Sequence, residues 1–123
     1  MERTVEFVCE HGAGKSRVAA ALFAAAGPRG WHATSAGLTP QEMVSEHATR
    51  LLAGDPAAEL LDVGPPSRFA PEAADMVVGI DCDLPGSRRW NLAYEWPTEQ
   101  ARDELRVLVA NLVAELRRRG CGP

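Results

Sequence analysis

The stretch over residues 5–17 constrains the fold of this chain more than any other, because it joins an apolar run to a helix through a glycine-containing loop. The run ends in Cys9, and Gly12 and Gly14 precede an alanine-rich segment that begins near Lys15. Glycine adopts positive φ without steric cost, so the backbone N–H groups of such a loop can turn inward around an anion. The first N–H groups of the helix and its dipole add to this attraction. The stretch therefore predicts an oxyanion-binding loop at the end of a strand.

The reactive group of this loop is predicted to be the side chain of Cys9. Amide N–H groups and a helix N-terminus stabilise the thiolate form, which is the nucleophile. A thiolate beside an anion-binding loop indicates chemistry on phosphate or arsenate. Lys15 and Ser16 are expected to take part in this chemistry. The residues expected to bind the phosphate are Glu10, His11, Gly12, Ala13, Gly14, Lys15 and Ser16.

Length and composition limit the remaining possibilities. The chain has 123 residues, 46% of them hydrophobic and 24% charged, which predicts one globular domain over residues 1–123. The formal net charge of −4 argues against a nucleic-acid partner, which requires a basic face. No signal peptide or membrane-spanning stretch is evident in the sequence. The three cysteines are few and widely spaced, which argues against a disulfide framework. These features predict a cytoplasmic protein without membrane contact.

Strand-like and helix-like segments alternate along the chain. Apolar runs predict strands at 4–9, 31–36, 75–80 and 89–92. Periodic segments predict helices over 15–26, 41–52 and 98–119, with a further helical turn at 57–61 and a proline-rich loop at 63–68. The alternation predicts an α/β three-layer sandwich with a short, mostly parallel four-stranded sheet flanked by helices. Ligands of such sheets bind beyond the carboxyl ends of the strands, where Cys9 lies.

Cys9, five further residues, a basic residue and Ser16 resemble the C-x5-R-[ST] loop of low-molecular-weight protein tyrosine phosphatases and the related thioredoxin-coupled arsenate reductases. Later segments are similar to the family in the same order: 34–37, 74–78, and Trp90 with Trp96-Pro97. The resemblance covers nearly the whole chain and implies the phosphatase fold. It implies a hydrolase in which Cys9 attacks phosphorus, with a phosphorylated protein or small molecule as partner and no cofactor.

Two departures from the family's pattern bear on activity. Lys15 stands where the family has an arginine, and lysine lacks the planar fork that holds two phosphate oxygens. Trp96 stands where the resemblance places an acidic residue before Pro97, and loss of a general acid typically lowers the rate about 10²–10⁴-fold. Glu95 is the candidate substitute, and Tyr94 and Trp96 are expected at the pocket rim. We therefore expect weak or altered hydrolysis of tyrosine phosphate-like monoesters, or alternatively a degenerate protein that binds phosphate or phosphoproteins without turnover.

Arsenate reduction is a second alternative. The arsenate reductases of the family use two more cysteines after the third strand. Here Cys82 follows that strand and is the candidate to form a disulfide with Cys9, whereas Cys121 near the C-terminus is not clearly placed for a relay. Thioredoxin would be a partner only under this alternative.

A nucleotide-binding protein is an alternative of another class. The Walker A motif, G-x4-G-K-[ST], differs from this loop only in having glycine where Cys9 stands, and Asp81 after an apolar run imitates a Walker B strand. The short chain and the lack of a base-recognition segment argue against it. Cys9, His11 and Cys82 match no standard zinc spacing, so no metal is expected.

Overall fold

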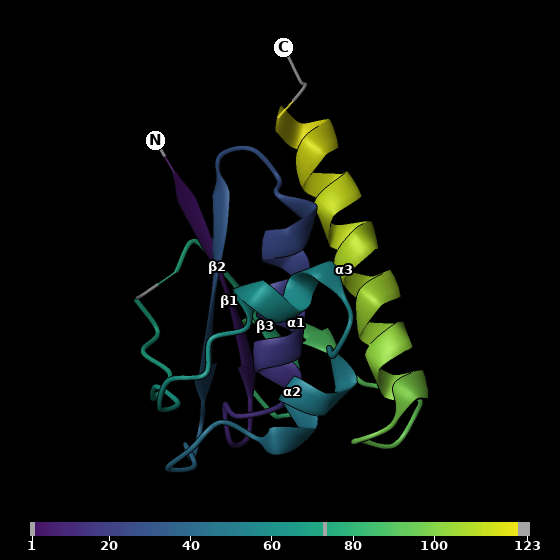
Figure 1. Ribbon diagram of the computed structural model, residues 1–123. Coiled ribbons are helices and arrows are strands. Elements are labelled where there is room, and N and C mark those ends of the chain that lie inside the picture. Colours follow the sequence, from purple (N-terminus) through teal and green to yellow (C-terminus); the bar gives the residue numbers. More distant parts are fainter. Residues whose placement is uncertain (1, 73, 121–123) are drawn as a thin grey trace.

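The computed structural model describes residues 2–72 and 74–120, and these residues form a four-stranded sheet with helices (Figure 1). The strand order is β2-β1-β3-β4, and every neighbouring pair is parallel. This confirms the predicted α/β class. In chain order the elements are β1 (Arg3–Cys9), α1 (Lys15–Ala26), β2 (Trp31–Gly37), α2 (Glu46–Leu51), the 3₁₀ helix η1 (Pro56–Leu60), β3 (Met76–Ile80), β4 (Arg88–Trp90) and α3 (Glu99–Gly120).

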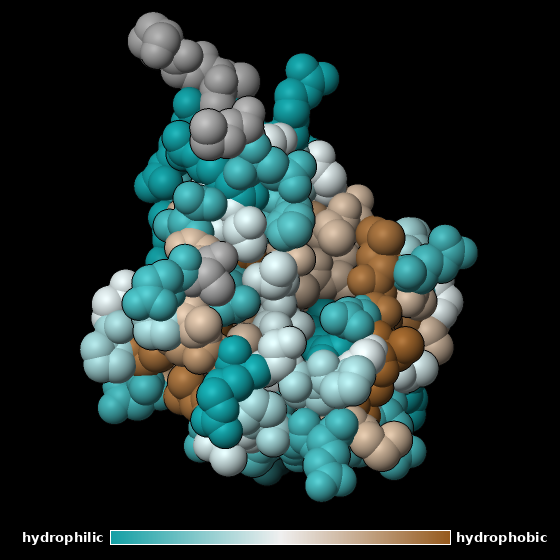
Figure 2. Space-filling view, turned by 90° about the vertical axis from the view of Figure 1, so that its left-hand side faces the viewer, coloured by the Kyte–Doolittle hydropathy of each residue, from teal (hydrophilic) through white to brown (hydrophobic). Residues whose placement is uncertain are grey.

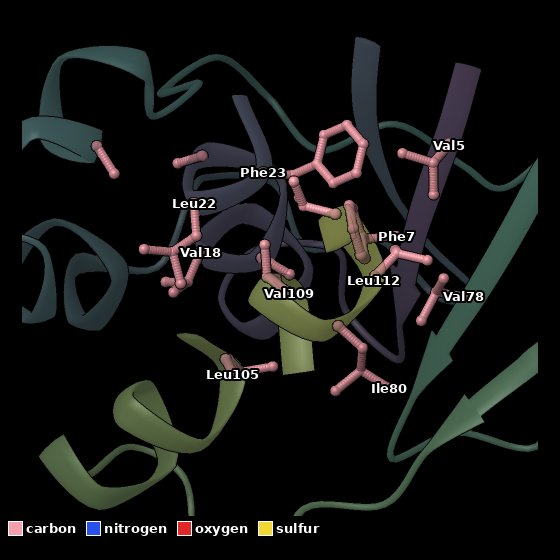
Figure 3. Close-up of a cluster of buried hydrophobic side chains, with 14 of the residues drawn as sticks. Val5, Phe7, Val18, Leu22, Phe23, Val78, Ile80, Leu105, Val109 and Leu112 are labelled. Atoms are coloured by element: carbon pink, nitrogen blue, oxygen red, sulfur yellow. The ribbon is translucent and has the colours of Figure 1, made fainter. Parts of the chain in front are cut away.

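The hydrophobic core lies between the sheet and the helices. Because side chains alternate along a strand, Val5, Phe7 and Cys9 of β1 point into this core. The ring of Phe7 packs edge-on against Phe23 of α1, with 5.9 Å between the ring centroids (Figure 3). Helix α3 completes the core with a stripe of residues that recur about once per helical turn, as expected for an amphipathic helix. This stripe consists of Leu105, Val109, Leu112, Val113 and Leu116.

Residues 61–72, which follow η1, run along the side of the strands that lies away from α3 (Figure 1). Ser67 and Phe69 of this segment exchange backbone hydrogen bonds with Gly37, at the C-terminal end of β2. This pairing covers part of the edge of the sheet, which would otherwise expose unpaired backbone groups. Figure 2 shows this face of the molecule as largely hydrophilic, with an apolar strip along one side.

Two predicted boundaries differ from the structure by two residues or more, and both differences trace to hydrogen bonds that only the folded chain makes. Helix α2 is shorter than the predicted 41–52, because the N–H groups of Gln41 and Ser45 donate to the loop carbonyls of His11 and Ala13 instead of starting a helix. Strand β4 ends at Trp90, short of the predicted 92, because the N–H of Leu92 donates to an Asp81 carboxylate oxygen.

None of the helices in the described residues is both long and apolar enough to cross a membrane.

Candidate active site

The loop over residues 10–14 turns its carbonyl groups outward. All six carbonyls from Cys9 to Gly14 accept hydrogen bonds from neighbouring segments; the donors are the N–H groups of Leu38, Thr39, Gln41, Ser45 and Val18 and the Nε of Arg17. In the described part of the chain, the N–H groups of residues 10–14 have no such partner. Outward carbonyls and unpartnered N–H groups are the arrangement of an anion-binding nest.

The two glycines of the loop serve different purposes. Gly12 has φ of +65°, and a Cβ there would lie 2.6 Å from the backbone nitrogen of Gly37. The loop backbone is therefore pressed against the end of β2, where only glycine fits. Gly14 has φ of −126°, so the positive φ considered for it from the sequence is not used. Its missing Cβ instead leaves room for Trp96, whose ring would lie 3.0 Å from that atom.

Arg17 is a structural residue of the site that the sequence did not reveal. It is only 2% exposed, although arginine is rarely buried without partners. Its Nε donates to the carbonyl of Gly12 at 3.1 Å, and its Nη1 donates to the carbonyl of Asp62 and lies 3.3 Å from that residue's carboxylate. Arg17 thus fastens the loop to the segment after η1. A lone arginine on an alanine-rich helix face was the only signal in the sequence.

Cys9 and Ser16 lie on either side of the loop and contact each other. The end of β1 carries Cys9 and the first turn of α1 carries Ser16, and a hydrogen bond of 3.2 Å joins Sγ to Oγ. Both side chains are buried. A hydroxyl at this distance can donate to a thiolate and stabilise its charge.

Lys15 lines the same cavity but is already paired. Its Nζ lies 3.0 Å from an Asp81 carboxylate oxygen, and both side chains are about one quarter exposed. The other carboxylate oxygen of Asp81 accepts the N–H of Leu92 at 2.8 Å. An ammonium group has three donors, so Lys15 keeps capacity for an anion while Asp81 offsets part of its charge.

A cavity of about 330 Å³ opens over the loop, lined also by the 41–47 segment and by Trp96 and Pro97. Within it lie Cys9, Glu10, His11, Ala13, Gly14 and Lys15. Glu95 is exposed and does not line this cavity. Tyr94 is 55% exposed and lines a different hollow, beside Val107 of α3. Of the predicted rim and acid residues, the structure therefore brings only Trp96 to the cavity.

Cys82 is buried next to the strand that carries Cys9. Its Sγ lies 3.6 Å from the carbonyl oxygen of Val8. Burial raises the pKa of the Cys82 thiol, and negative charge on Cys9 raises it further. Cys121, the third cysteine, lies outside the described residues. Nowhere in residues 2–72 and 74–120 do three His, Cys, Asp or Glu side chains gather as a metal site would require.

The structure is that of a parallel α/β protein with a cysteine-containing loop after its first strand. No family model and no curated protein sequence matches the chain. Among solved structures, it is similar to an arsenate reductase of Archaeoglobus fulgidus, with 30% identity and a TM-score of 0.67 over 89% of this chain and 98% of that one. The chain belongs to the family of low-molecular-weight protein tyrosine phosphatases and thioredoxin-dependent arsenate reductases.

Two further structures share the fold at lower identity. A thioredoxin-dependent arsenate reductase of Corynebacterium glutamicum is 22% identical with a TM-score of 0.75 over 94% of this chain, which spans 62% of that protein's length. An arginine phosphatase of Geobacillus stearothermophilus is 21% identical with a TM-score of 0.73, covering 95% of this chain and 94% of that one. The fold is thus shared by proteins with different named activities, and the residues of the site must decide between them.

Proposed function

We propose that this protein hydrolyses phosphate monoesters, with Cys9 as the nucleophile. One observation carries the proposal: the carbonyls of residues 9–14 all accept hydrogen bonds from elsewhere in the chain, and the Cys9 thiol lines the cavity over the loop, hydrogen-bonded to Ser16. The inward N–H groups of such a loop hold a phosphate dianion and stabilise the charge that develops on its equatorial oxygens. The family includes phosphatases, which supports this assignment.

The reaction proceeds in two displacements. The Cys9 thiolate attacks phosphorus, forming an S–P bond while the P–O bond to the leaving group breaks. The leaving oxygen takes a proton from water. A second water then attacks phosphorus, the S–P bond breaks, the thiolate is restored and the water's proton passes to solvent. Ser16 donates to the sulfur whenever it is anionic, and the amides and Lys15 hold the phosphoryl oxygens.

Turnover is expected to be slow, for two reasons that the structure supports. Lys15 presents a point charge already shared with Asp81, in place of a forked guanidinium. The residue beside Pro97 that lines the cavity is Trp96, which cannot protonate a leaving oxygen. If the protein does not turn over phosphate esters at all, the same site would make it a phosphate-binding or phosphoprotein-binding protein.

The proposal is tested by alkylation and by turnover. Iodoacetamide at mildly acidic pH should modify Cys9 faster than Cys82, because only Cys9 faces the loop amides, and phosphate should protect it. p-Nitrophenyl phosphate should be hydrolysed slowly, and Cys9→Ser should abolish this. Equal labelling of both thiols, with no protection by phosphate, would disprove the anion site.

Arsenate reduction is the second candidate, because the structure brings Cys82 beside the strand that ends in Cys9. In that reaction the Cys9 thiolate bonds to arsenic while one arsenate oxygen, protonated by solvent, leaves as water. The Cys82 thiolate then attacks the Cys9 sulfur, the S–As bond breaks with its electron pair passing to arsenic, and arsenite leaves as the disulfide forms. Arsenic gains two electrons, and the two thiols lose them. A dithiol reductant such as thioredoxin must then reduce the disulfide.

The two candidates separate in one assay. Arsenate with thioredoxin, thioredoxin reductase and NADPH should give no sustained NADPH oxidation if the protein is a phosphatase alone. Consumption that depends on both Cys9 and Cys82 would establish arsenate reduction. A nucleotide-binding role would appear instead as a rise in melting temperature with Mg²⁺ and ATP but not with inorganic phosphate.

A further inference from the structure

The indole ring of Trp96 lies against the loop over residues 10–14. Three of its atoms, Cζ2, Cε2 and Nε1, lie 3.0, 3.2 and 3.2 Å from the position that a Cβ on Gly14 would take. The ring therefore fills the space that a larger residue at position 14 would need. Because a Cα–Cβ bond adds only about 1.5 Å, Nε1 lies within about 5 Å of the Gly14 Cα.

The position of this ring is fixed by the segment that carries it. Trp96 is half-buried and packs against the hydrophobic core. The carbonyl of Glu95 accepts a hydrogen bond of 2.6 Å from the Thr98 hydroxyl, and that hydroxyl in turn accepts the N–H of Ala101 at 3.1 Å. Since Ala101 belongs to the first turn of α3, the segment is fastened to the start of a long helix.

The indole N–H of Trp96 is a hydrogen-bond donor that the fold leaves free. Within residues 2–72 and 74–120 it meets no acceptor, and the only buried side-chain nitrogen or oxygen without a partner there is Oε1 of Glu6. Nε1 is therefore accessible to water. The edge of the ring that carries this N–H is the edge that meets Gly14, and Trp96, Gly14 and Lys15 line the same cavity. The free donor thus lies beside the space that an anion would occupy.

An anion held by the loop would bring an acceptor to this donor. The N–H groups of residues 10–14 have no partner in the described part of the chain. An oxygen that accepts from the N–H of Gly14 would lie about 2.9 Å from that nitrogen, and hence close to the indole edge. A phosphoryl oxygen carries negative charge, so a hydrogen bond to it is stronger than one between neutral groups.

We propose that Trp96 is a phosphate-binding residue, whose Nε1–H donates a hydrogen bond to an oxygen of the phosphoryl group held by the loop. The inference rests on the proposed function, which supplies that phosphoryl group. An indole N–H donates a hydrogen bond without giving up its proton. The residue before Pro97 thus strengthens the binding of the anion and does not assist the departure of the leaving group. The site then favours holding phosphate over turning its esters over.

The test observes the indole N–H directly. Full-length ¹⁵N-labelled protein is titrated with inorganic phosphate, and ¹H–¹⁵N correlation spectra record the backbone amides and the indole signals of Trp31, Trp90 and Trp96. The indole proton of Trp96 should move downfield and saturate together with the amide signals of residues 10–16, because it enters a charge-assisted hydrogen bond. The signal of Trp31 should not move, since Trp31 begins β2 and the loop contacts the other end of that strand.

Two replacements of Trp96 measure the strength of the contact. Site-specific replacement by 3-benzothienylalanine puts sulfur in place of the N–H and keeps the shape of the ring. It should weaken phosphate binding about tenfold by calorimetry, the effect of roughly one hydrogen bond to a charged acceptor. Trp96→Phe should weaken binding at least as much. Trp31→Phe is the matched control and should leave the affinity for phosphate unchanged.

The outcomes separate this inference from the proposed function. If phosphate shifts the loop amides but not the Trp96 indole proton, the role of Trp96 is overturned and the anion site remains. Unchanged phosphate affinity in the benzothienyl protein has the same meaning. If phosphate shifts neither the loop amides nor the indole signal, the proposed function itself fails. The titration of the parent protein needs no substitution, so it decides the question even where a variant does not fold.

Discussion

The two sides of the cavity differ in how many hydrogen bonds and buried contacts hold them in place. On the loop side, six consecutive carbonyls are bonded outward, and the buried Arg17 fastens the turn at Gly12. We define the leaving-group side as residues 94–97. There Tyr94 and Glu95 are exposed, and their hydrogen bonds involve the backbone: the N–H of Tyr94 donates to the Glu104 carboxylate at 3.1 Å, and the carbonyl of Glu95 accepts from the Thr98 hydroxyl.

This difference shows that anion binding and proton delivery are separate properties of the fold. The loop is held by backbone hydrogen bonds and by the close approach of Gly12 to the end of β2. Under the proposed function, proton delivery would depend on one side chain beside Pro97, and the residue that lines the cavity there is Trp96. We therefore expect the protein to favour leaving groups that need no proton.

The loop side should fail most severely when its contact with β2 is disturbed. Gly12→Ala places a Cβ within 2.6–2.9 Å of backbone atoms of residues 36 and 37, at a positive φ. We expect a loss of about 3 kcal/mol in the free energy of unfolding, together with loss of phosphate binding. Chemical denaturation and calorimetry measure the two effects.

Gly54→Ala is the matched control for that variant. Gly54 also has positive φ, at +82°, but a Cβ there would meet nothing within 4 Å. Its cost should be only the conformational one, about 1 kcal/mol, with phosphate binding unchanged. Equal losses in the two variants would show that packing against β2 does not hold the loop.

The leaving-group side should gain function when an acid is supplied. Trp96→Asp should raise kcat/KM relative to Trp96→Asn by about 10²-fold with phenyl phosphate, and much less with p-nitrophenyl phosphate, whose leaving group needs little protonation. The asparagine variant has the same size and loses the same contact with Gly14, so the ratio isolates proton donation. A ratio near one with both substrates would mean that residue 96 does not face the leaving oxygen.

Lys15 belongs to the loop side, but its ammonium group lacks the two-pronged hydrogen bonding of an arginine. Lys15→Arg should raise kcat/KM for p-nitrophenyl phosphate by about tenfold, because a guanidinium regains a second charge-assisted hydrogen bond of roughly 1.5 kcal/mol. Lys15→Met, which removes the charge, should lower it. Combined with Trp96→Asp, the gain should exceed that of either change alone. Reduced activity in Lys15→Arg would instead indicate that lysine suits a different substrate.

The same contrast explains which features were predictable from the sequence. The strands and helices follow from local periodicity, and the loop follows from the spacing between Cys9 and Ser16. The role of Arg17 depends on the carbonyls of Gly12 and Asp62, which are brought to it only by folding. The pairing of Lys15 with Asp81 likewise joins residues 66 positions apart. The displacement of Tyr94 from the cavity reflects loop geometry that no periodicity encodes.

The smallest predicted effect concerns β1, the strand that carries Cys9, and the contribution of its Glu6 side chain to the free energy of unfolding. Glu6 of β1 is 7% exposed; its Oε2 accepts a hydrogen bond from Thr34, and its Oε1 has no partner in the described residues. Burial raises the pKa of Glu6 above its ordinary value of 4.5, although the Thr34 hydroxyl opposes the shift. The folded state therefore holds this proton more tightly than the unfolded state does.

Stability from this group is fully present below pH 4.5 and is lost as the pH rises through the raised pKa. Glu6→Gln removes the titration and should stabilise the protein by about 1 kcal/mol at neutral pH, with the gain vanishing in acid. Glu115→Gln is the control of opposite sign, because the hydrogen bond from Arg88 lowers the pKa of Glu115. That variant should lose stability at neutral pH, and its difference from the parent should likewise shrink as the pH falls. Denaturation curves at several pH values measure both effects. A neutral-pH loss in Glu6→Gln as well would show that the carboxylate is better accommodated in β1 than its unpartnered oxygen indicates.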